Sequence, residues 1–152
     1  MPKSRKFNLL DIAKANLLTA KTMRQHTSGD DKIIDICAYH CQQCIEKTAK
    51  YAILLQGVDY AADHRMDIYL EDLAEGEFKN LFRSIAYDVD LWATNIRHRG
   101  SILSSAKAVD AIIKTCDELI KKAEALTPAA FDEDTTEVPK PSALLNGEGL
   151  YH

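Results

Sequence analysis

Apolar residues recur at steps of three and four through most of the first 126 positions, the spacing of helices that bury one face. The clearest pattern covers about Asp31 to Gln56. There, one stripe carries Ile34, Cys37, Cys41, Cys44, Thr48, Ala52 and Leu55. This regular stripe predicts a long helix whose inner seam lies in the core of the protein.

Four further segments show helical periodicity, and the glycines between them mark turns. Asn8 and Asp11 have the spacing of a capping box, which predicts the start of the first helix. Ser104 or Ser105 is expected to cap the last helix. The segments are about Asn8 to His26, Met66 to Ala74, Glu77 to Arg97, and Ser104 or Ser105 to Leu126. No segment has strand character, so the sequence predicts an all-α fold, an antiparallel up-and-down bundle of four long helices plus one short helix.

The chain is expected to form one folded domain, followed by a tail. Its 152 residues suffice for a single continuous core, which is assigned to residues 1–127. From Pro128 onwards the sequence holds three of the four prolines and an acidic run. Residues 128–152 are therefore interpreted as an extended or disordered tail, whose apolar end could still dock on its own bundle or on a neighbour.

Charge and hydropathy narrow the classes of partner. The net charge of -4 argues against phosphate binding over the whole surface, so nucleic acid would require a local basic patch. No apolar run reaches the roughly 18 to 20 residues that span a bilayer, and the basic N-terminus lacks a secretory pattern. A cytoplasmic location without a membrane partner is therefore expected.

The stretch "CAYHCQQCIEK", residues 37 to 47, raises the question of a metal or redox site. On a continuous helix it could offer two ligands, such as His40 with Cys44, and the others would have to come from Cys116 and His98. The C-x-x-C pair lies in the middle of a helix, where nothing lowers a thiol pKa. Because the sulfurs coincide with the apolar seam, reduced core cysteines are the preferred interpretation, and neither a metal nor a cofactor is expected.

The polar residues of the same helix carry a family resemblance. Residues 39 to 73, "YHCQQCIEKTAKYAILLQGVDYAADHRMDIYLEDL", resemble the HEPN domain family, whose second helix has the pattern aQQAxEKxxKaxLxxxG followed by a tHdLxxL segment. The resemblance extends over about residues 8 to 126. The matching positions are Gln42, Gln43, Glu46, Lys47, Lys50, Leu54 or Leu55, and Gly57, with His64, Asp67, Leu70 and Leu73 after them. From periodicity alone, Gln43, Glu46 and Lys47 could lie at a dimer seam or on solvent.

The resemblance implies a bundle of four to five helices, frequent homodimers, and association with a minimal nucleotidyltransferase or another partner. Many members are linked to nucleotide or RNA binding. Some are metal-independent, toxin-like ribonucleases with an R-x4-6-H motif, in which the arginine steadies phosphate charge and the histidine transfers protons. None of the arginines here has a histidine five to seven positions later, so the chain resembles the members that are not nucleases.

The remaining candidate chemistry is a basic group before Gly100. Asn95, Arg97, His98 and Arg99 are the expected nucleotide or phosphate site, because a guanidinium matches phosphate oxygens, although cations also suit a helix C-terminus. His98 and His64 are the only candidate catalytic residues. The preferred function is a homodimeric binding module for a nucleotide, RNA or a nucleotidyltransferase. Two alternatives stay open: a divergent metal-independent ribonuclease, and a structural or regulatory protein-interaction domain.

Overall fold

Five helices make up the regular structure of the chain. The computed structural model describes residues 5–61, 65–99 and 105–128, with side chains described for 9–61, 65–92 and 105–128, and these ranges contain no strand. The helices are α1 (Arg5–Gln25), α2 (Asp31–Leu55), α3 (Met66–Asp72), α4 (Glu77–Arg99) and α5 (Ala106–Glu124). The predicted all-α fold of four long helices and one short helix is thus confirmed.

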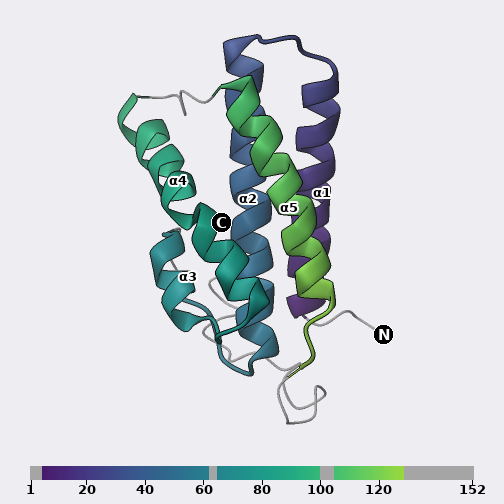
Figure 1. Cartoon of the computed structure of the whole chain (residues 1–152), viewed down its shortest axis with the longest axis vertical. Coiled ribbons are helices and arrows are strands. Elements are labelled where there is room, and N and C mark those ends of the chain that lie inside the picture. The colour runs from purple at the N-terminus through teal and green to yellow at the C-terminus, as the bar shows by residue number, and fades with distance from the viewer. Residues whose placement is uncertain (1–4, 62–64, 100–104, 129–152) are drawn as a thin grey trace.

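The four long helices run alternately up and down, with α3 beside α4 at one end (Figure 1). Helix α2 lies in the middle and contacts each of the other four. This central position explains why α2 buries far more than one stripe. Its second half is enclosed on nearly every side, including positions that carry charge.

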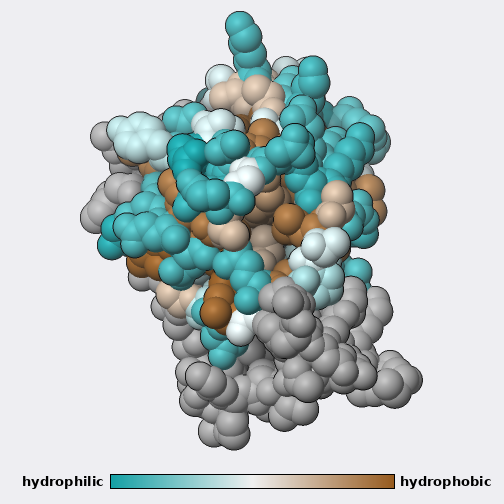
Figure 2. All heavy atoms as spheres, turned by 60° about the horizontal axis from the view of Figure 1, so that its bottom comes forward, coloured by the Kyte–Doolittle hydropathy of each residue, from teal (hydrophilic) through white to brown (hydrophobic). Residues whose placement is uncertain are grey.

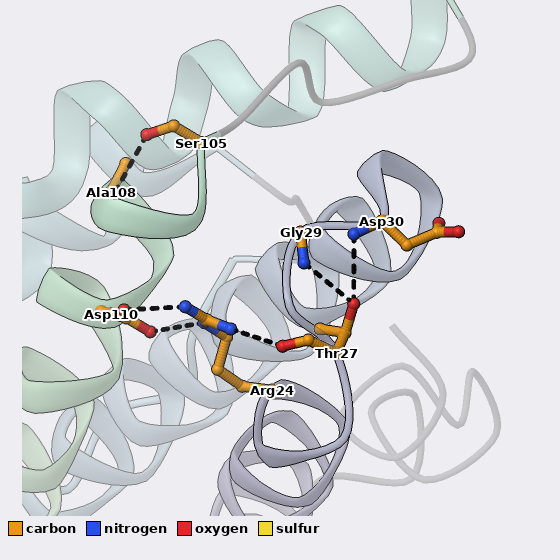
Figure 3. Close-up of polar contacts among 7 residues, drawn as sticks. All are labelled: Arg24, Thr27, Gly29, Asp30, Ser105, Ala108 and Asp110. Atoms are coloured by element: carbon orange, nitrogen blue, oxygen red, sulfur yellow. Dashed lines mark hydrogen bonds and ion pairs between the residues drawn. The ribbon is translucent and has the colours of Figure 1, made fainter.

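Side chains cap the N-termini of α2 and α5, whereas the cap predicted for α1 is not formed. Asp30 caps α2 by accepting hydrogen bonds from the amides of Lys32 (3.0 Å) and Ile33 (3.2 Å). Ser105 caps α5 and accepts from the Ala108 amide at 3.1 Å, as predicted (Figure 3). The capping box predicted at Asn8 is wrong, because α1 begins three residues earlier and position 8 lies inside the helix.

Ion pairs join α1 to α5 along their length. Arg24 donates to both carboxylate oxygens of Asp110, at 2.7 and 3.2 Å, and to the carbonyl of Thr27 at 2.8 Å (Figure 3). Further along, Lys21 pairs with Asp117 and Lys14 with Glu124. These pairs are half-exposed, so each contributes at most about 1 kcal/mol to stability. Their main effect is to fix the register of the two antiparallel helices.

The core is formed by the predicted seams. Every cysteine is buried, and the α4 stripe from Phe78 to Trp92 faces inward. Trp92 is 8% exposed and belongs to this core. None of the described helices is both long and apolar enough to cross a membrane. The predicted tail lies outside the described residues apart from Pro128, so it stays a prediction.

Candidate anion site on the central helix

A second stripe runs along α2, opposite the cysteine seam. Positions 36, 39, 43, 46 and 50 alternate steps of three and four, which places them on one side of the helix. Ile36 and Tyr39 are exposed, Gln43 is half-buried, and Glu46 and Lys50 are buried. The stripe therefore leads from an open apolar end into an enclosed charged end.

The charged end consists of Glu46, Lys47 and Lys50, which we call the buried charge cluster. Their exposed fractions are 0%, 2% and 1%. The Lys50 ammonium lies 3.0 Å from a carboxylate oxygen of Glu46, one helical turn away, and the Lys47 ammonium lies 3.6 Å from the same oxygen. The expectation that Glu46 and Lys47 face solvent or a second copy is wrong, because the other elements of a single chain already cover α2 here.

Two tyrosines complete the surroundings of Lys50. Its ammonium lies 4.9 Å from the ring centre of Tyr60 and 5.8 Å from that of Tyr69. A cation at such a distance from an aromatic ring is attracted by the ring quadrupole. The Tyr69 hydroxyl donates to the carbonyl of Ala61 at 3.2 Å, which holds that ring in place. Lys50 is thus satisfied by one carboxylate and two aromatic rings.

Local turns bring these tyrosines to α2. Gly57 follows the helix with φ of 86°, a left-handed conformation that glycine adopts without strain, and its amide donates to the Leu54 carbonyl at 3.0 Å. The chain then returns past α2 and places Tyr60 against Lys50. On the far side, Asp90 of α4 accepts from the backbone amide of Met66 at 2.7 Å and fixes the start of α3.

Lys47 is less well satisfied than its neighbour. Its ammonium is buried and has no hydrogen-bond partner within the described part of the chain, since the carboxylate of Glu46 is 3.6 Å away. Burial and, after it, the charge of Lys50 lower the pKa of Lys47 to about 8, although the carboxylate of Glu46 opposes the shift. With all three groups ionised, the buried charge cluster holds two positive charges and one negative charge.

The cysteines form a separate cluster between α2 and α5. The Cys116 thiol lies 3.8 Å from the carbonyl of Cys41, and contact with the Cys41 and Cys44 side chains, together with burial, raises the pKa of Cys116 well above its usual value. His40 hydrogen-bonds to Asn16 of α1 at 2.8 Å instead of pairing with Cys44. Among the described residues no group of His, Cys, Asp and Glu side chains is arranged to hold a metal.

A cavity of about 290 Å³ opens at the end of the bundle where α2 and α5 finish and α4 begins. Figure 2 brings this end forward and shows apolar surface between hydrophilic side chains. Leu55, Phe78 and Leu126 contribute apolar walls, while Glu75 and Glu77 add negative charge to the lining. That charge disfavours a phosphate, so this cavity does not compete with the buried charge cluster as an anion site.

The other predicted site residues are not tested. The side chains of Asn95, Arg97, His98 and Arg99 at the end of α4, and the whole of His64, lie outside the described residues. Their roles in phosphate binding or proton transfer stay predictions. Sequence reasoning noted Lys50 only as a position of the family motif and did not select it as a site residue, although the four-residue step from Glu46 to Lys50 is a recognisable helical ion-pair spacing.

Comparison with known proteins agrees with the family resemblance that the α2 motif carries. The family model described as HEPN domain matches residues 8–126, which include all of α2, α3, α4 and α5 and most of α1. No curated protein and no solved structure matches the chain. Because the match spans most of the sequence and includes the stripe that carries the buried charge cluster, the chain belongs to the HEPN domain family.

Proposed function

We propose that this HEPN domain is a binding module for a phosphate-bearing ligand, a nucleotide or RNA. The observation that carries the proposal is the Lys47 ammonium, which is buried without a hydrogen-bond partner beside a second lysine and a single carboxylate. A buried ammonium group that makes no hydrogen bond costs free energy that a bound anion would recover.

Binding is preferred to catalysis on chemical grounds. The family's ribonuclease mechanism requires an arginine and a histidine at a fixed spacing, and this sequence has no such pair. The buried charge cluster contains lysines and a glutamate whose ammonium and carboxylate groups already satisfy each other in part. This arrangement can hold an anion, and it supplies no group placed to activate a nucleophile.

We also propose that the module acts as a homodimer. Apolar side chains remain uncovered on the outer faces of α2 and α4, where Ile36 is 43%, Tyr39 44% and Tyr87 73% exposed. Apolar surface of this kind favours association with a partner surface. Sedimentation equilibrium of the wild type and of a Tyr87→Glu variant checks this part, and a monomeric wild type at micromolar concentration would contradict it. The predicted nucleotidyltransferase partner stays an expectation from the resemblance.

The binding part is tested by titrating ATP and short RNAs against the full-length chain. We expect saturable binding that weakens in Lys47→Met. Lys114→Met is the matched control, because Lys114 is an exposed lysine on α5. An Arg97→Ala, Arg99→Ala double variant tests the end of α4 in the same assay. If no ligand binds the wild type saturably, the proposed function is refuted.

A further inference from the structure

The cavity at the end of the bundle offers an apolar lining to whatever enters it. Leu55, Leu73 and Phe78 belong to this lining and are 5%, 4% and 5% exposed, and Ala52 of α2 adds a small side chain beside them. The cavity volume of about 290 Å³ is roughly twice that of an engineered cavity of about 150 Å³ that holds one benzene molecule. It therefore has room for about two leucine-sized side chains.

Hydrogen bonds fix the shape of this cavity. The side-chain amide nitrogen of Gln56 donates to the carbonyl of Asp72 at 2.9 Å, and its oxygen accepts from the amide of Ala74 at 2.8 Å. These bonds join the end of α2 to the segment between α3 and α4, which supplies five consecutive residues and the adjoining Phe78 to the lining. Because the folded chain forms the cavity in advance, its occupation costs little reorganisation.

The rim of the cavity is acidic. Glu75 and Glu77 belong to the lining, with side chains 76% and 89% exposed, and no lysine, arginine or histidine is found among its described residues. Glu75 pairs with Lys79 at 3.3 Å, whereas the Lys122 ammonium lies 3.9 Å from Glu77. An occupant that combines apolar side chains with a positive charge near Glu77 therefore fits this cavity best.

The chain itself leaves the bundle at this cavity. Leu126 and Thr127 belong to the lining, and the sequence continues from them into residues 129–152, which lie outside the described residues. Leu144 follows Thr127 by 17 positions. A flexible segment of that length spans on the order of 20 to 25 Å between its ends. Such a connection keeps the following residues beside the cavity at an effective concentration in roughly the millimolar range.

Two apolar stretches after Pro128 have the wrong charge for the rim. Phe131 adjoins an acidic run that extends over residues 132–137. Leu150 and Tyr151 follow closely after Glu148. Either stretch would bring negative charge toward the carboxylates of the rim, and like charges repel.

The stretch "PKPSALL", residues 139–145, has the chemistry that the cavity requires. Lys140 is the only lysine or arginine after Lys122, and it precedes the pair Leu144 and Leu145 by four positions. The prolines on both sides of Lys140 restrict the backbone, which reduces the conformational entropy lost on docking. This stretch supplies two apolar side chains and one positive charge.

We propose that residues 139–145 of this chain dock in the cavity at the end of the bundle. The Leu144 and Leu145 side chains fill the apolar lining, and the Lys140 ammonium lies at the Glu77 carboxylate. A partner protein that presents the same combination of side chains has to displace this segment. The cavity is then an interaction surface that the chain itself occupies, and this inference is independent of phosphate binding.

Heteronuclear NMR of the full-length chain tests where the segment lies. The Leu144→Ser, Leu145→Ser variant is compared with wild type, and Leu150→Ser, Tyr151→Ser is the matched control. We expect the first variant to shift the amide resonances of residues 73–78 and to remove nuclear Overhauser contacts between leucine methyl groups and the Phe78 ring. The control should leave both unchanged. All four substitutions lie outside the helices α1 to α5, so circular dichroism should show unchanged helix content.

A peptide titration measures how fully the chain occupies its own cavity. A fluorescent peptide with the sequence of residues 138–147 is titrated against the full-length Leu144→Ser, Leu145→Ser variant and against wild type. We expect saturable binding to the variant. Wild type should bind the peptide at least roughly 5-fold more weakly, because its own segment competes at a high effective concentration.

Charge reversal tests the position of Lys140. In the Leu144→Ser, Leu145→Ser background, Glu77→Lys should weaken the peptide by roughly 2- to 5-fold at low salt, and less at high salt. A peptide that carries Lys140→Glu should recover the affinity for the Glu77→Lys protein. Glu118→Lys is the control, because Glu118 is an exposed residue of α5 outside the cavity lining.

Each contrary result overturns a stated part of the proposal. If Leu144→Ser, Leu145→Ser leaves the cavity resonances unchanged, or if the peptide does not bind this variant saturably, docking is wrong. Shifts caused only by Leu150→Ser, Tyr151→Ser would refute the assignment to residues 139–145. Contacts that disappear on dilution as a dimer dissociates would place the segment of a second copy in the cavity. Peptide affinity indifferent to Glu77→Lys would refute the ion pair with Lys140.

Discussion

Replacing Lys47 by methionine should stabilise the ligand-free protein, which is an unusual expectation for a buried residue. Methionine has a similar length and is apolar, so it fills the same space without a charge. The neighbouring Glu46 keeps Lys50 as its partner at 3.0 Å, and the substitution leaves no new unpaired charge. Buried ion groups replaced by apolar residues of similar volume are often neutral or stabilising for this reason.

The magnitude follows from the pKa of Lys47. A decrease from 10.5 to about 8 corresponds to about 3 kcal/mol of cost for the charged form in the folded state, at about 1.4 kcal/mol per pKa unit. This value is an upper limit, because a long side chain can relax toward solvent and reduce its burial cost. We expect the variant to gain about 1 to 3 kcal/mol in the free energy of unfolding at pH 7.

The pKa of Lys47 also predicts how the stability difference between the two proteins changes with pH. Between pH 8 and pH 10.5 the unfolded chain keeps the Lys47 proton while the folded chain has lost it, so the unfolded state binds more protons. The contribution of Lys47 to stability therefore rises with pH across this window, and its full cost is present below pH 8. The advantage of Lys47→Met over the wild type should shrink as the pH rises from 8 to 10.5.

Urea unfolding monitored by circular dichroism measures both effects. The readout is the difference in the free energy of unfolding between wild type and Lys47→Met at pH 7, 8, 9 and 10. This difference removes the contributions of other groups that titrate in both proteins. Lys114→Met, at an exposed position, should differ from wild type by less than about 0.5 kcal/mol at every pH. A Lys47→Met variant that is less stable than wild type at pH 7, or an advantage independent of pH, would refute the reasoning.

Three further outcomes follow from the described contacts. Glu46→Gln leaves two buried lysines without a carboxylate and should cost about 3 to 5 kcal/mol in urea unfolding; a loss below 1 kcal/mol would show that the lysines are solvated. Asp90→Ala removes the acceptor for the Met66 amide and should cost about 1 kcal/mol, with faster hydrogen exchange confined to α3. Cys116 is buried and its pKa is raised, so a thiol reagent should label it only after unfolding, and rapid labelling of the native protein would contradict the packing between α2 and α5.

The helices were predictable because local chemistry specifies them. The α2 seam recurs at steps of three and four from Ile34 to Leu55, and Ser105 offers the hydroxyl that caps a helix N-terminus. The beginning of α1 was not predictable from Asn8, since a capping pattern marks only a preferred start. An asparagine inside a helix costs less than about 1 kcal/mol, so the helix can extend through it to Arg5.

The buried charge cluster could not be predicted in the same way. The motif pointed to Glu46 and Lys47, but charged residues are normally exposed, so periodicity favoured solvent or a dimer seam. Their burial depends on contacts between distant elements. Tyr60 reaches Lys50 only because of the turn at Gly57, and Tyr69 reaches it only because α3 packs nearby. Contacts between elements that are distant in the sequence cannot be predicted from the residue spacing of a single helix.

The energetic cost of Lys47 is itself an argument about function. The fold does not require a second lysine beside Glu46. Lys50 alone neutralises that carboxylate at 3.0 Å, and its ammonium also lies over the Tyr60 ring. An apolar side chain at position 47 would pack against the same neighbours without the cost of burying a charge. A residue that lowers stability in this way is expected where the protein uses its charge. The stability gained by Lys47→Met and the ligand affinity it loses should therefore appear together in one variant, which ties the packing of α2 to the proposed site.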